Sequence, residues 1–373
     1  MVVPFLEEDP DLVVRTLGIA AAHPSVAQVA AVAGTHTPTN LAVEAAARGL
    51  PGAPIDVIGQ ERVGDRRPGK GDAINTGFRY FLDRPQLDRI HFYDSEIRSF
   101  GADWIEKAEA AADLGYEAVR HYYPRAATDA MITWMVVRTG FALVWPDSEL
   151  PWIQQPLSGE LIYTRSAAEA MTSDPLVLSQ SDWGIDTVLT FASVSHGLSI
   201  YECYISQGKD HALYGTLADI RTMMIECLAA LQRLPRIHPP SPVVHRVEYP
   251  HAVSPSIAEK IGYDVQATQS LLSSGWSEGQ VALLTDFFAP EIASGAKEWR
   301  NWPDSSFLDE DAWFSALRTM MDHFVFGDTD WEDLVFRLWV GRVLNYTMRV
   351  AVRGHPHSMA YLNDMITRAI ASG

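Results

Sequence analysis

Over residues 1 to about 95, short runs of apolar residues alternate with segments in which apolar side chains recur every three or four positions. This alternation is typical of a parallel sheet with crossover helices. The predicted strands cover residues 2–5, 26–32, 55–58, 89–93 and 117–122. The predicted helices cover residues 10–22, with Asp9 as N-cap, and residues 41–48, 72–82 and 102–113. The N-terminal part is therefore predicted to be an α/β unit.

The pattern changes near residue 216. A helical pattern covers residues 221–232, a proline-rich crossing covers residues 235–255, and amphipathic helices are predicted at residues 311–323 and 331–350. The tryptophans of this part are expected to build a helical core. We predict two domains, an α/β domain over residues 1–215 and a mainly helical domain over residues 216–373.

Composition supports an ordered protein with a large core. The chain has 373 residues, of which 47% are hydrophobic and 20% charged, which argues against intrinsic disorder. The formal net charge of -18 disfavours nucleic acid and anionic membranes as partners. A protein of this charge needs local positive charge or a metal ion to bind an anionic substrate.

The cysteines and the N-terminus bear on the compartment. The two cysteines, Cys203 and Cys227, suit a reducing environment without a disulfide framework. The N-terminus shows no signal-peptide pattern, and the apolar stretch of residues 131–145 is interrupted by Arg138 and too short to span a bilayer. We expect a cytoplasmic protein; the oligomeric state, including a homo-oligomer, is left open.

The most informative motif follows the predicted fourth strand. The apolar run of residues 90–93 ends in two acids one residue apart, Asp94 and Glu96. Ligands of α/β sheets lie beyond the carboxyl ends of strands, and paired carboxylates offer oxygen ligands to a hard divalent cation. The alternative is a solvated acidic turn that caps the next helix.

Two clusters could bind anions. Lys70 lies between two glycines at a predicted helix start, in a loop of residues 60–72 that lacks the spacing of a phosphate-binding P-loop. Arg125 could hold a small carboxylate through its guanidinium, with Thr133 adding a hydroxyl. The alternatives are a flexible surface turn for Lys70 and a structural ion pair for Arg125.

Two further segments carry candidate polar groups. Residues 181–186 place Asp182 and Asp186 at a predicted strand–helix junction, where sugar hydroxyls are often held; helix capping by Asp182 is the alternative. His211 is a candidate metal ligand, or else a surface histidine. The sequence contains no G-x-S-x-G elbow, zinc-type cysteine pairing or G-x-G-x-x-G motif, so serine hydrolases and dinucleotide oxidoreductases are disfavoured.

Taken together, these segments resemble the mannosylglycerate synthase family, which are retaining glycosyltransferases of the GT-A fold. The resembling stretches are residues 60–62, 67–72, 89–94, 128–134, 155–157, 181–187, 200–204 and 342–348. They extend over nearly the whole chain. The seven-residue stretch 181–187 is far more specific than the two acids alone.

The resemblance implies transfer of mannose from GDP-mannose to the 2-hydroxyl of D-glycerate or a related small hydroxy acid. The product would be the compatible solute mannosylglycerate, and the cofactor a divalent metal, Mn²⁺ or Mg²⁺. It also implies roles for individual residues: Asp94, Glu96 and His211 as metal ligands; Gln60, Lys70, Asp94, Leu157, Asp186 and Tyr214 in nucleotide-sugar binding; Arg125 and Thr133 in acceptor binding; Lys70 and Asp186 in catalysis.

Three positions depart from the family pattern. Glu96 replaces an aspartate, Ala212 replaces an arginine beside the metal histidine, and Leu6 replaces an early lysine. These changes remove positive charge or move a carboxylate. Three alternatives stay open. They are a sister enzyme with another nucleotide-hexose donor such as GDP-glucose, a weakly active or non-catalytic nucleotide-sugar binder, and a purely structural partner protein.

Overall fold

The computed structural model describes residues 1–34, 37–210, 215–237, 239, 243–250, 253–258, 260–299 and 302–373. The chain divides into two compact units. Unit 1 contains residues 1–124, 154–212 and 239–252, and unit 2 contains residues 125–153, 213–238 and 253–373. The boundary predicted between residues 215 and 216 stays a prediction.

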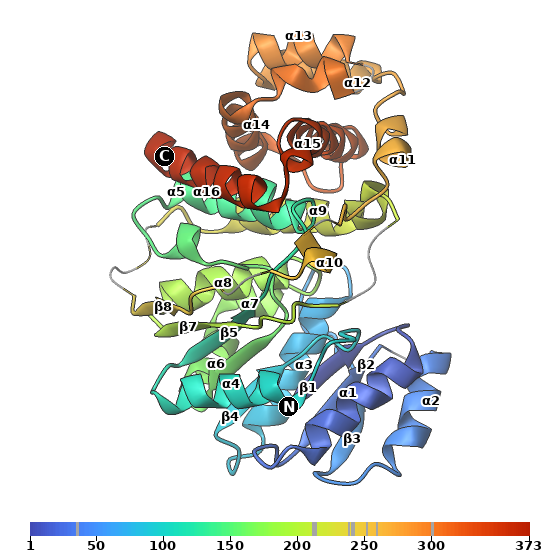
Figure 1. Ribbon diagram of the computed structural model, residues 1–373, viewed down its shortest axis with the longest axis vertical. Coiled ribbons are helices and arrows are strands. Elements are labelled where there is room, and N and C mark those ends of the chain that lie inside the picture. The colour runs from blue at the N-terminus through green and yellow to red at the C-terminus, as the bar shows by residue number, and fades with distance from the viewer. Residues whose placement is uncertain are drawn as a thin grey trace. The chain divides into compact units, whose positions relative to one another are not determined.

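Unit 1 is built on an eight-stranded sheet with the order β3-β2-β1-β4-β6-β5-β7-β8 (Figure 1). The strands are β1 (Val2–Phe5), β2 (Val29–Ala33), β3 (Ile55–Gly59), β4 (Arg89–Phe92), β5 (Ala118–Tyr122), β6 (Leu161–Thr164), β7 (Ile200–Tyr204) and β8 (His245–Val247). All paired neighbours run parallel except β6, which is antiparallel to both β4 and β5. The predicted α/β class is therefore confirmed, with one reversed strand inside the sheet.

The reversed strand determines which residues meet at one edge of the sheet. Leu161, the first residue of β6, pairs with Phe92 at the end of β4 and with Arg120 near the end of β5. The start of β6 therefore lies beside the carboxyl ends of its neighbours. The residues that precede β6 consequently lie next to those that follow β4.

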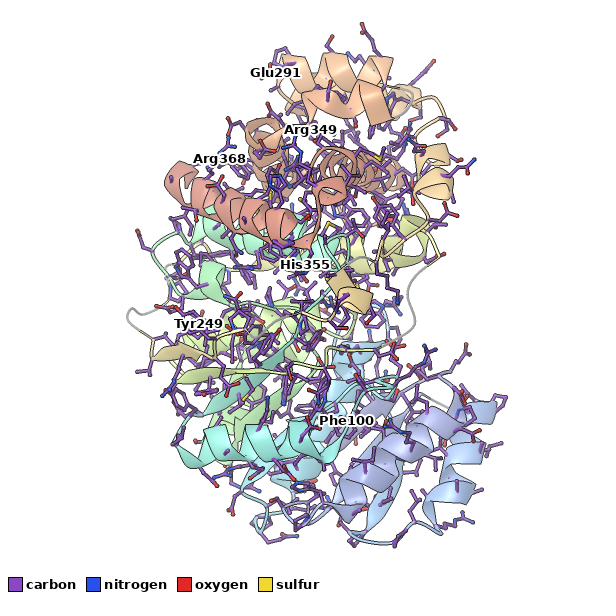
Figure 2. All side chains as sticks on the ribbon, viewed as in Figure 1. Phe100, Tyr249, Glu291, Arg349, His355 and Arg368 are labelled. Atoms are coloured by element: carbon purple, nitrogen blue, oxygen red, sulfur yellow. The ribbon has the colours of Figure 1, made fainter. Side chains whose placement is uncertain are left out.

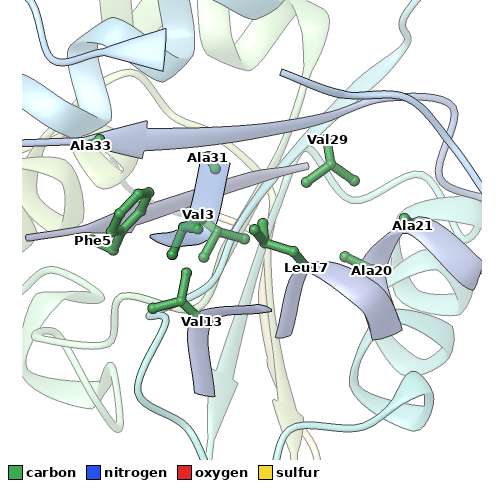
Figure 3. Packing of buried hydrophobic residues seen from close by; sticks show 10 residues of the cluster. Val3, Phe5, Val13, Leu17, Ala20, Ala21, Val29, Ala31 and Ala33 are labelled. Carbon is green, nitrogen blue, oxygen red and sulfur yellow. The ribbon is translucent and has the colours of Figure 1, made fainter. Parts of the chain in front are cut away.

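Helices cover both faces of the sheet (Figure 1). One face carries α1 (Pro10–Ala22), α2 (Pro38–Ala47) and α4 (Ala102–Asp113); the other carries α3 (Lys70–Leu82), α6 (Arg165–Ser173), α7 (Pro175–Ser179) and α8 (Ile185–Ser195). Figure 3 shows the core between α1 and the sheet, where Val3, Phe5 and Ala31 of the strands meet Val13 and Leu17 of α1. Alternate residues of β1 face this core, as the two-residue period of a strand requires.

Most predicted elements of unit 1 are confirmed, with shifted ends. The prediction at residues 41–48 is too late because the Thr37 hydroxyl accepts from the Asn40 amide and caps α2. Helix α3 begins at Lys70 rather than at residue 72. The strand–helix junction predicted around Asp182 is wrong, since this segment joins α7 to α8. Asp182 is buried and accepts from the Gly184 amide at 2.8 Å, so it organises this turn, but it is not the cap of α8, whose N-cap position is Gly184 and which has no side-chain cap.

Unit 2 is helical. Its helices are η1, a π-helix (Thr133–Arg138), α5 (Thr139–Val144), η2 (Leu150–Trp152), η3 (Leu217–Ile220), α9 (Arg221–Arg233), α10 (Pro255–Ala258), α11 (Val265–Ser270), α12 (Glu278–Phe287), α13 (Pro290–Glu298), η4 (Trp302–Phe307), α14 (Glu310–His323), α15 (Thr329–Arg349), η5 (Ala351–Arg353) and α16 (His355–Ser372). Trp299, Trp313, Trp331 and Trp339 are buried, so the predicted tryptophan core is confirmed for these four residues. None of the helices in the described ranges combines the length and apolar character needed to cross a bilayer.

Candidate active site

Lys70 links two carboxylates at the carboxyl edge of the sheet. It is the first residue of α3, and its Nζ lies 3.0 Å from Asp186 Oδ2 and 3.2 Å from Asp94 Oδ1. Asp94 follows β4, and Asp186 lies in the first turn of α8. Three segments that are distant in sequence therefore converge on one ammonium group.

A second lysine extends this arrangement. Lys209, which follows β7, places Nζ 2.7 Å from Asp94 Oδ2 and 2.8 Å from Glu160 Oε1. Glu160 is fully buried just before β6, and its other oxygen accepts from the Tyr123 hydroxyl at 3.0 Å and the Ser158 hydroxyl at 2.8 Å. We call the series Glu160–Lys209–Asp94–Lys70–Asp186 the charge chain. Its signs alternate along the whole series, so every buried charge in it has an opposite neighbour.

Burial and pairing compete in setting the protonation states. Burial of the Asp94 carboxyl opposes its ionisation, but the ammonium groups of Lys209 and Lys70 outweigh burial and hold its pKa well below the ordinary value. Burial likewise favours neutral lysines, yet the carboxylates keep the pKa of Lys70 and of Lys209 above the usual range. The chain is therefore ionised at these three positions near neutral pH.

Asp186 differs from the other acids. Burial raises the pKa of its carboxyl to about 6, with Lys70 opposing the rise and Asp94 adding to it. Oδ2 accepts from Lys70, whereas the buried Oδ1 has no hydrogen-bond partner among the described residues. A buried carboxylate oxygen without a donor is costly in a folded protein, and it is the group that a ligand hydroxyl would satisfy.

Two glycines, Gly159 and Gly71, allow close packing of the segments around Lys70. A Cβ at Gly159 would lie 2.5 Å from Asp94 Oδ1 and 2.6 Å from Lys70 Nζ. A Cβ at Gly71 would lie 2.1 Å from the main-chain oxygen of Gln180. Gly159 therefore lets the segment before β6 approach Asp94 and Lys70, and Gly71 lets the first turn of α3 pack against the segment after α7.

The loop before α3 is fixed by a buried acid. Asp72 Oδ1 accepts from the amides of Val63 and Gly64, both at 2.9 Å, and Oδ2 lies 2.6 Å from Arg62 Nη1. This loop, for which a flexible surface turn was the alternative interpretation, is thus tied to the first turn of α3. Because Lys70 lies two residues before Asp72 in the same helical turn, these bonds also hold the backbone of Lys70 in place.

Glu96 is the acid most accessible to a cation. It is half-buried, and burial, with the Asp94 charge adding, raises the pKa of its carboxyl. It makes no hydrogen bond or ion pair with any described residue. Asp94 and Glu96 supply the oxygen chemistry that a hard divalent cation needs. Within the described ranges no group of three His, Cys, Asp or Glu side chains is placed to hold a metal, and the third predicted ligand, His211, lies outside those ranges.

Of the other residues predicted to bind the nucleotide sugar, Gln60 and Leu157 lie within the described residues and Tyr214 does not. Gln60 is half-buried directly after β3. Leu157 is half-buried in a loop whose main chain accepts from Arg120, Nη2 of which lies 3.2 Å from the Pro156 oxygen. Tyr214 and Ala212 lie outside the described residues.

Arg125 and Thr133, the predicted acceptor-binding residues, belong to unit 2. Arg125 Nε lies 3.5 Å from Asp129 Oδ2, and the Arg125 main-chain oxygen pairs with His355 Nε2 at 2.9 Å. Thr133 is buried at the first position of η1. The local contacts of Arg125 match the ion pair that was its alternative interpretation, and its role toward an acceptor stays a prediction.

Sequence reasoning missed Lys209 and Glu160 as members of the site. Lys209 lies two residues before His211, and only the histidine was singled out from the sequence. Glu160 precedes a strand, and candidate ligands were sought after strands, where parallel sheets place them. The signal that could have found it is the short apolar run after Gly159 and Glu160, once that run is taken as an antiparallel strand.

Comparison with known proteins agrees with this geometry. The sequence model of the mannosylglycerate synthase GT domain matches residues 1–233, and that of the C-terminal domain of the same family matches residues 257–366. Mannosylglycerate synthase of Rhodothermus marinus is 51% identical over 371 residues, covering 99% of this chain and 93% of that protein. The enzyme named mannosylglycerate synthase in Selaginella moellendorffii is 49% identical over 368 residues, covering 97% of this chain and 87% of that protein.

Solved structures are similar in fold. Glucosyl-3-phosphoglycerate synthase from Mycobacterium tuberculosis, crystallised with phosphoglyceric acid, superposes with a TM-score of 0.50 at 22% identity and covers 64% of this chain and 80% of its own. A complex of that enzyme with Mn²⁺, UDP-glucose and glycerol 3-phosphate gives the same values. These neighbours establish the GT-A glycosyltransferase fold that the sequence predicted. With that fold, a matching GT domain and relatives about half identical over nearly its full length, the chain belongs to the mannosylglycerate synthase family and is a hexosyltransferase.

Proposed function

We propose that this enzyme transfers mannose from GDP-mannose to the 2-hydroxyl of D-glycerate, with retention of configuration, and so makes mannosylglycerate. The observation that carries the proposal is the charge chain. It places two ammonium groups and an Asp186 oxygen that lacks a hydrogen-bond donor at one edge of the sheet. In the proposed division of labour, residues 1–215 bind the nucleotide sugar and residues 216–373 form a helical domain. The two free, buried cysteines fit a cytoplasmic location.

Loss of the GDP leaving group builds negative charge on the diphosphate. Lys70 lies at a helix N-terminus, where the backbone dipole and the ammonium group both favour an anion. Lys209 holds Asp94 from the opposite side and so keeps Lys70 directed to the same place. A divalent cation, Mn²⁺ or Mg²⁺, held by Glu96, Asp94 and His211 would offset the same charge when bound.

Asp186 is proposed to orient the donor sugar. Its unpaired Oδ1 can accept a sugar hydroxyl, while the bond from Lys70 to Oδ2 fixes the carboxylate plane. Half-buried Leu157 would contact the sugar and Gln60 and Tyr214 the nucleotide, as the family resemblance implies. Retention then follows from attack on the face that the leaving group vacates; Asp186 is also the candidate nucleophile for a two-step route.

The acceptor carboxylate is assigned to Arg125, with Thr133 adding a hydroxyl. A guanidinium holds a carboxylate through two parallel hydrogen bonds, which would direct the 2-hydroxyl of glycerate to the anomeric carbon. Arg125 Nε lies 3.5 Å from Asp129 Oδ2, and in this proposal the acceptor carboxylate takes the place of the Asp129 carboxylate.

A donor-by-acceptor screen tests the proposal. GDP-mannose, GDP-glucose and UDP-glucose are each incubated with D-glycerate, D-lactate or glycerol, with Mn²⁺, Mg²⁺ or a chelator, and GDP or UDP release and product mass are measured. We expect turnover with GDP-mannose and D-glycerate that the chelator abolishes. Proton NMR of the product should show an α-linked mannose, and a β-linked product would refute retention.

The departures at Leu6, Glu96 and Ala212 favour one alternative, a weakly active nucleotide-sugar binder. Calorimetric binding of GDP-mannose without product on addition of D-glycerate would support it over the proposed function. The Glu96→Asp protein isolates the carboxylate from the other two changes. We expect it to bind Mn²⁺ more tightly, measured as free Mn²⁺ by electron paramagnetic resonance, and an unchanged affinity would show that the longer side chain is without consequence.

A further inference from the structure

Unit 2 contains an open surface hollow of about 510 Å³ that the proposed reaction does not use. Two arginines and a histidine line it, Arg349, Arg353 and His357, together with Tyr361 and apolar side chains. We call it the anion pocket. Figure 2 labels Arg349 and His355, which lie in the two helices that form the pocket.

Local backbone geometry brings the basic side chains together. Helix α15 ends at Arg349, the short turn η5 ends at Arg353, and α16 begins at His355. Gly354 joins the last two with a φ of +98°, a left-handed conformation that glycine adopts without strain. Three basic residues within nine positions therefore project from one tight turn instead of spreading along a continuous helix.

The charge balance of the pocket is opposite to that of the protein. The net charge is -18, yet none of the lining residues is acidic. The Arg353 side chain makes no hydrogen bond or ion pair with any described residue. Among those residues the Arg349 guanidinium donates only to the neutral amide oxygen of Asn345, at 3.0 Å. The nearby carboxylate of Glu310 is already bound by Arg342 and Arg368, each at 3.3 Å.

We infer that the anion pocket binds the phosphate group of a small phosphate ester. Guanidinium groups stay charged and match phosphate oxygens through paired hydrogen bonds. The N-terminus of α16, an 18-residue helix without a side-chain cap, adds a favourable dipole beside these cations. The volume lies within the range of small-molecule sites and exceeds that of a bare phosphate ion, which leaves room for the ester's organic part.

The pocket is also tied to the proposed acceptor residue. His355, between Arg353 and His357, pairs through Nε2 with the main-chain oxygen of Arg125 at 2.9 Å. A ligand that orders this turn would therefore restrain Arg125, a consequence that rests on the proposed acceptor role. We expect saturating glycerol 3-phosphate to change the KM for D-glycerate about twofold or more, and unchanged kinetics alongside intact binding would refute this connection alone.

Calorimetric titration with inorganic phosphate and with glycerol 3-phosphate tests the site itself. We expect saturable binding, tighter for the ester, that weakens roughly tenfold or more in the Arg349→Gln/Arg353→Gln protein. The Arg236→Gln protein is the matched control, because Arg236 is an exposed arginine of unit 2 paired with Asp322 at 3.1 Å. Circular dichroism establishes that each variant folds.

Three results would overturn the inference. One is binding that never saturates, and another is equal loss of affinity in the control. The third is loss of phosphate binding in a Lys70→Gln protein with full binding in the double arginine variant, because that would place the phosphate at the charge chain. Since these titrations contain neither donor nor acceptor, their outcome is independent of the transfer reaction.

Discussion

Gly159→Ala is the sharpest test of the charge chain, because it adds one methyl group between Asp94 and Lys70. The new Cβ would lie 2.5 Å from Asp94 Oδ1 and 2.6 Å from Lys70 Nζ. Ordinary contacts begin near 3.4 Å, so these atoms must retreat by about 0.8 to 0.9 Å. The φ of Gly159 lies outside the left-handed region, so the effect comes from these contacts and not from backbone strain.

The magnitude follows from that displacement. The pairs of Lys70 with Asp94 and Asp186 are 3.2 Å and 3.0 Å long, so a shift of almost 1 Å breaks one of them. A misplacement of about 1 Å at a reacting centre can cost about 100-fold in rate. We expect kcat to fall about 10- to 100-fold. Overpacking of a buried site should lower the free energy of unfolding by about 1 to 3 kcal/mol.

The assay is steady-state release of GDP, together with denaturant unfolding of the same samples. Gly18→Ala is the matched control, because a Cβ at Gly18 meets only Leu50, at an ordinary 3.6 Å. It should keep wild-type kcat. If Gly159→Ala retained kcat within about twofold of wild type, the reasoning that Lys70 must stay in place for turnover would be refuted.

Three further predictions address single members of the site. Lys209→Met leaves the buried Glu160 carboxylate without its cation and should lower the free energy of unfolding by about 3 kcal/mol in urea titrations. The pKa of Asp186, raised to about 6 by burial, means that its charge is lost as pH falls through 6. The pH profile of kcat/KM should therefore lose activity below about pH 6, because Lys70 loses its charged partner, and Asp186→Asn should remove this limb. Arg125→Ala should raise the KM for D-glycerate about tenfold or more with little change in kcat, as measured by initial rates.

Each of these predictions has a control or an opposing outcome. Lys107→Met is the control for Lys209→Met, since among the described residues the Lys107 ammonium donates only to the main-chain oxygen of Tyr204. An equal loss of unfolding free energy in both variants would mean that the effect does not come from the Lys209–Glu160 pair. An acid limb that survives in Asp186→Asn would belong to another group. An unchanged acceptor KM in Arg125→Ala would leave only the structural ion pair as its role.

The fold was largely predictable because its signals are local. Strands β1, β3 and β4 are short apolar runs between turn residues, and the periodicity of α1 and α15 extends over several turns. Strand β6 was not predicted, because its direction follows from pairing with β4 and β5, which no local pattern records. The wrong junction at Asp182 has a similar cause, since a five-residue helix, α7, carries little periodicity.

The site was predictable where residues follow strands or begin helices. Asp94, Lys70 and Asp186 were found in this way, and the structure brings them together. Lys209 and Glu160 were missed because their role depends on sheet register. Which partner each charge takes is a three-dimensional property, and it changes the picture of Asp94, since both of its oxygens are already paired with lysines.

The burial of the charge chain has a consequence for the stability of the site at high salt concentration. Lys70, Lys209 and Asp186 expose less than a tenth of their side chains, and Glu160 exposes none. Dissolved ions screen exposed charges over about 8 Å at physiological strength but reach buried ones poorly. A surface pair such as Arg48–Glu44, with side chains 75% and 46% exposed, will weaken as salt accumulates. The buried members of the charge chain are sheltered from that effect, so their pairing should persist at salt concentrations that weaken such surface pairs.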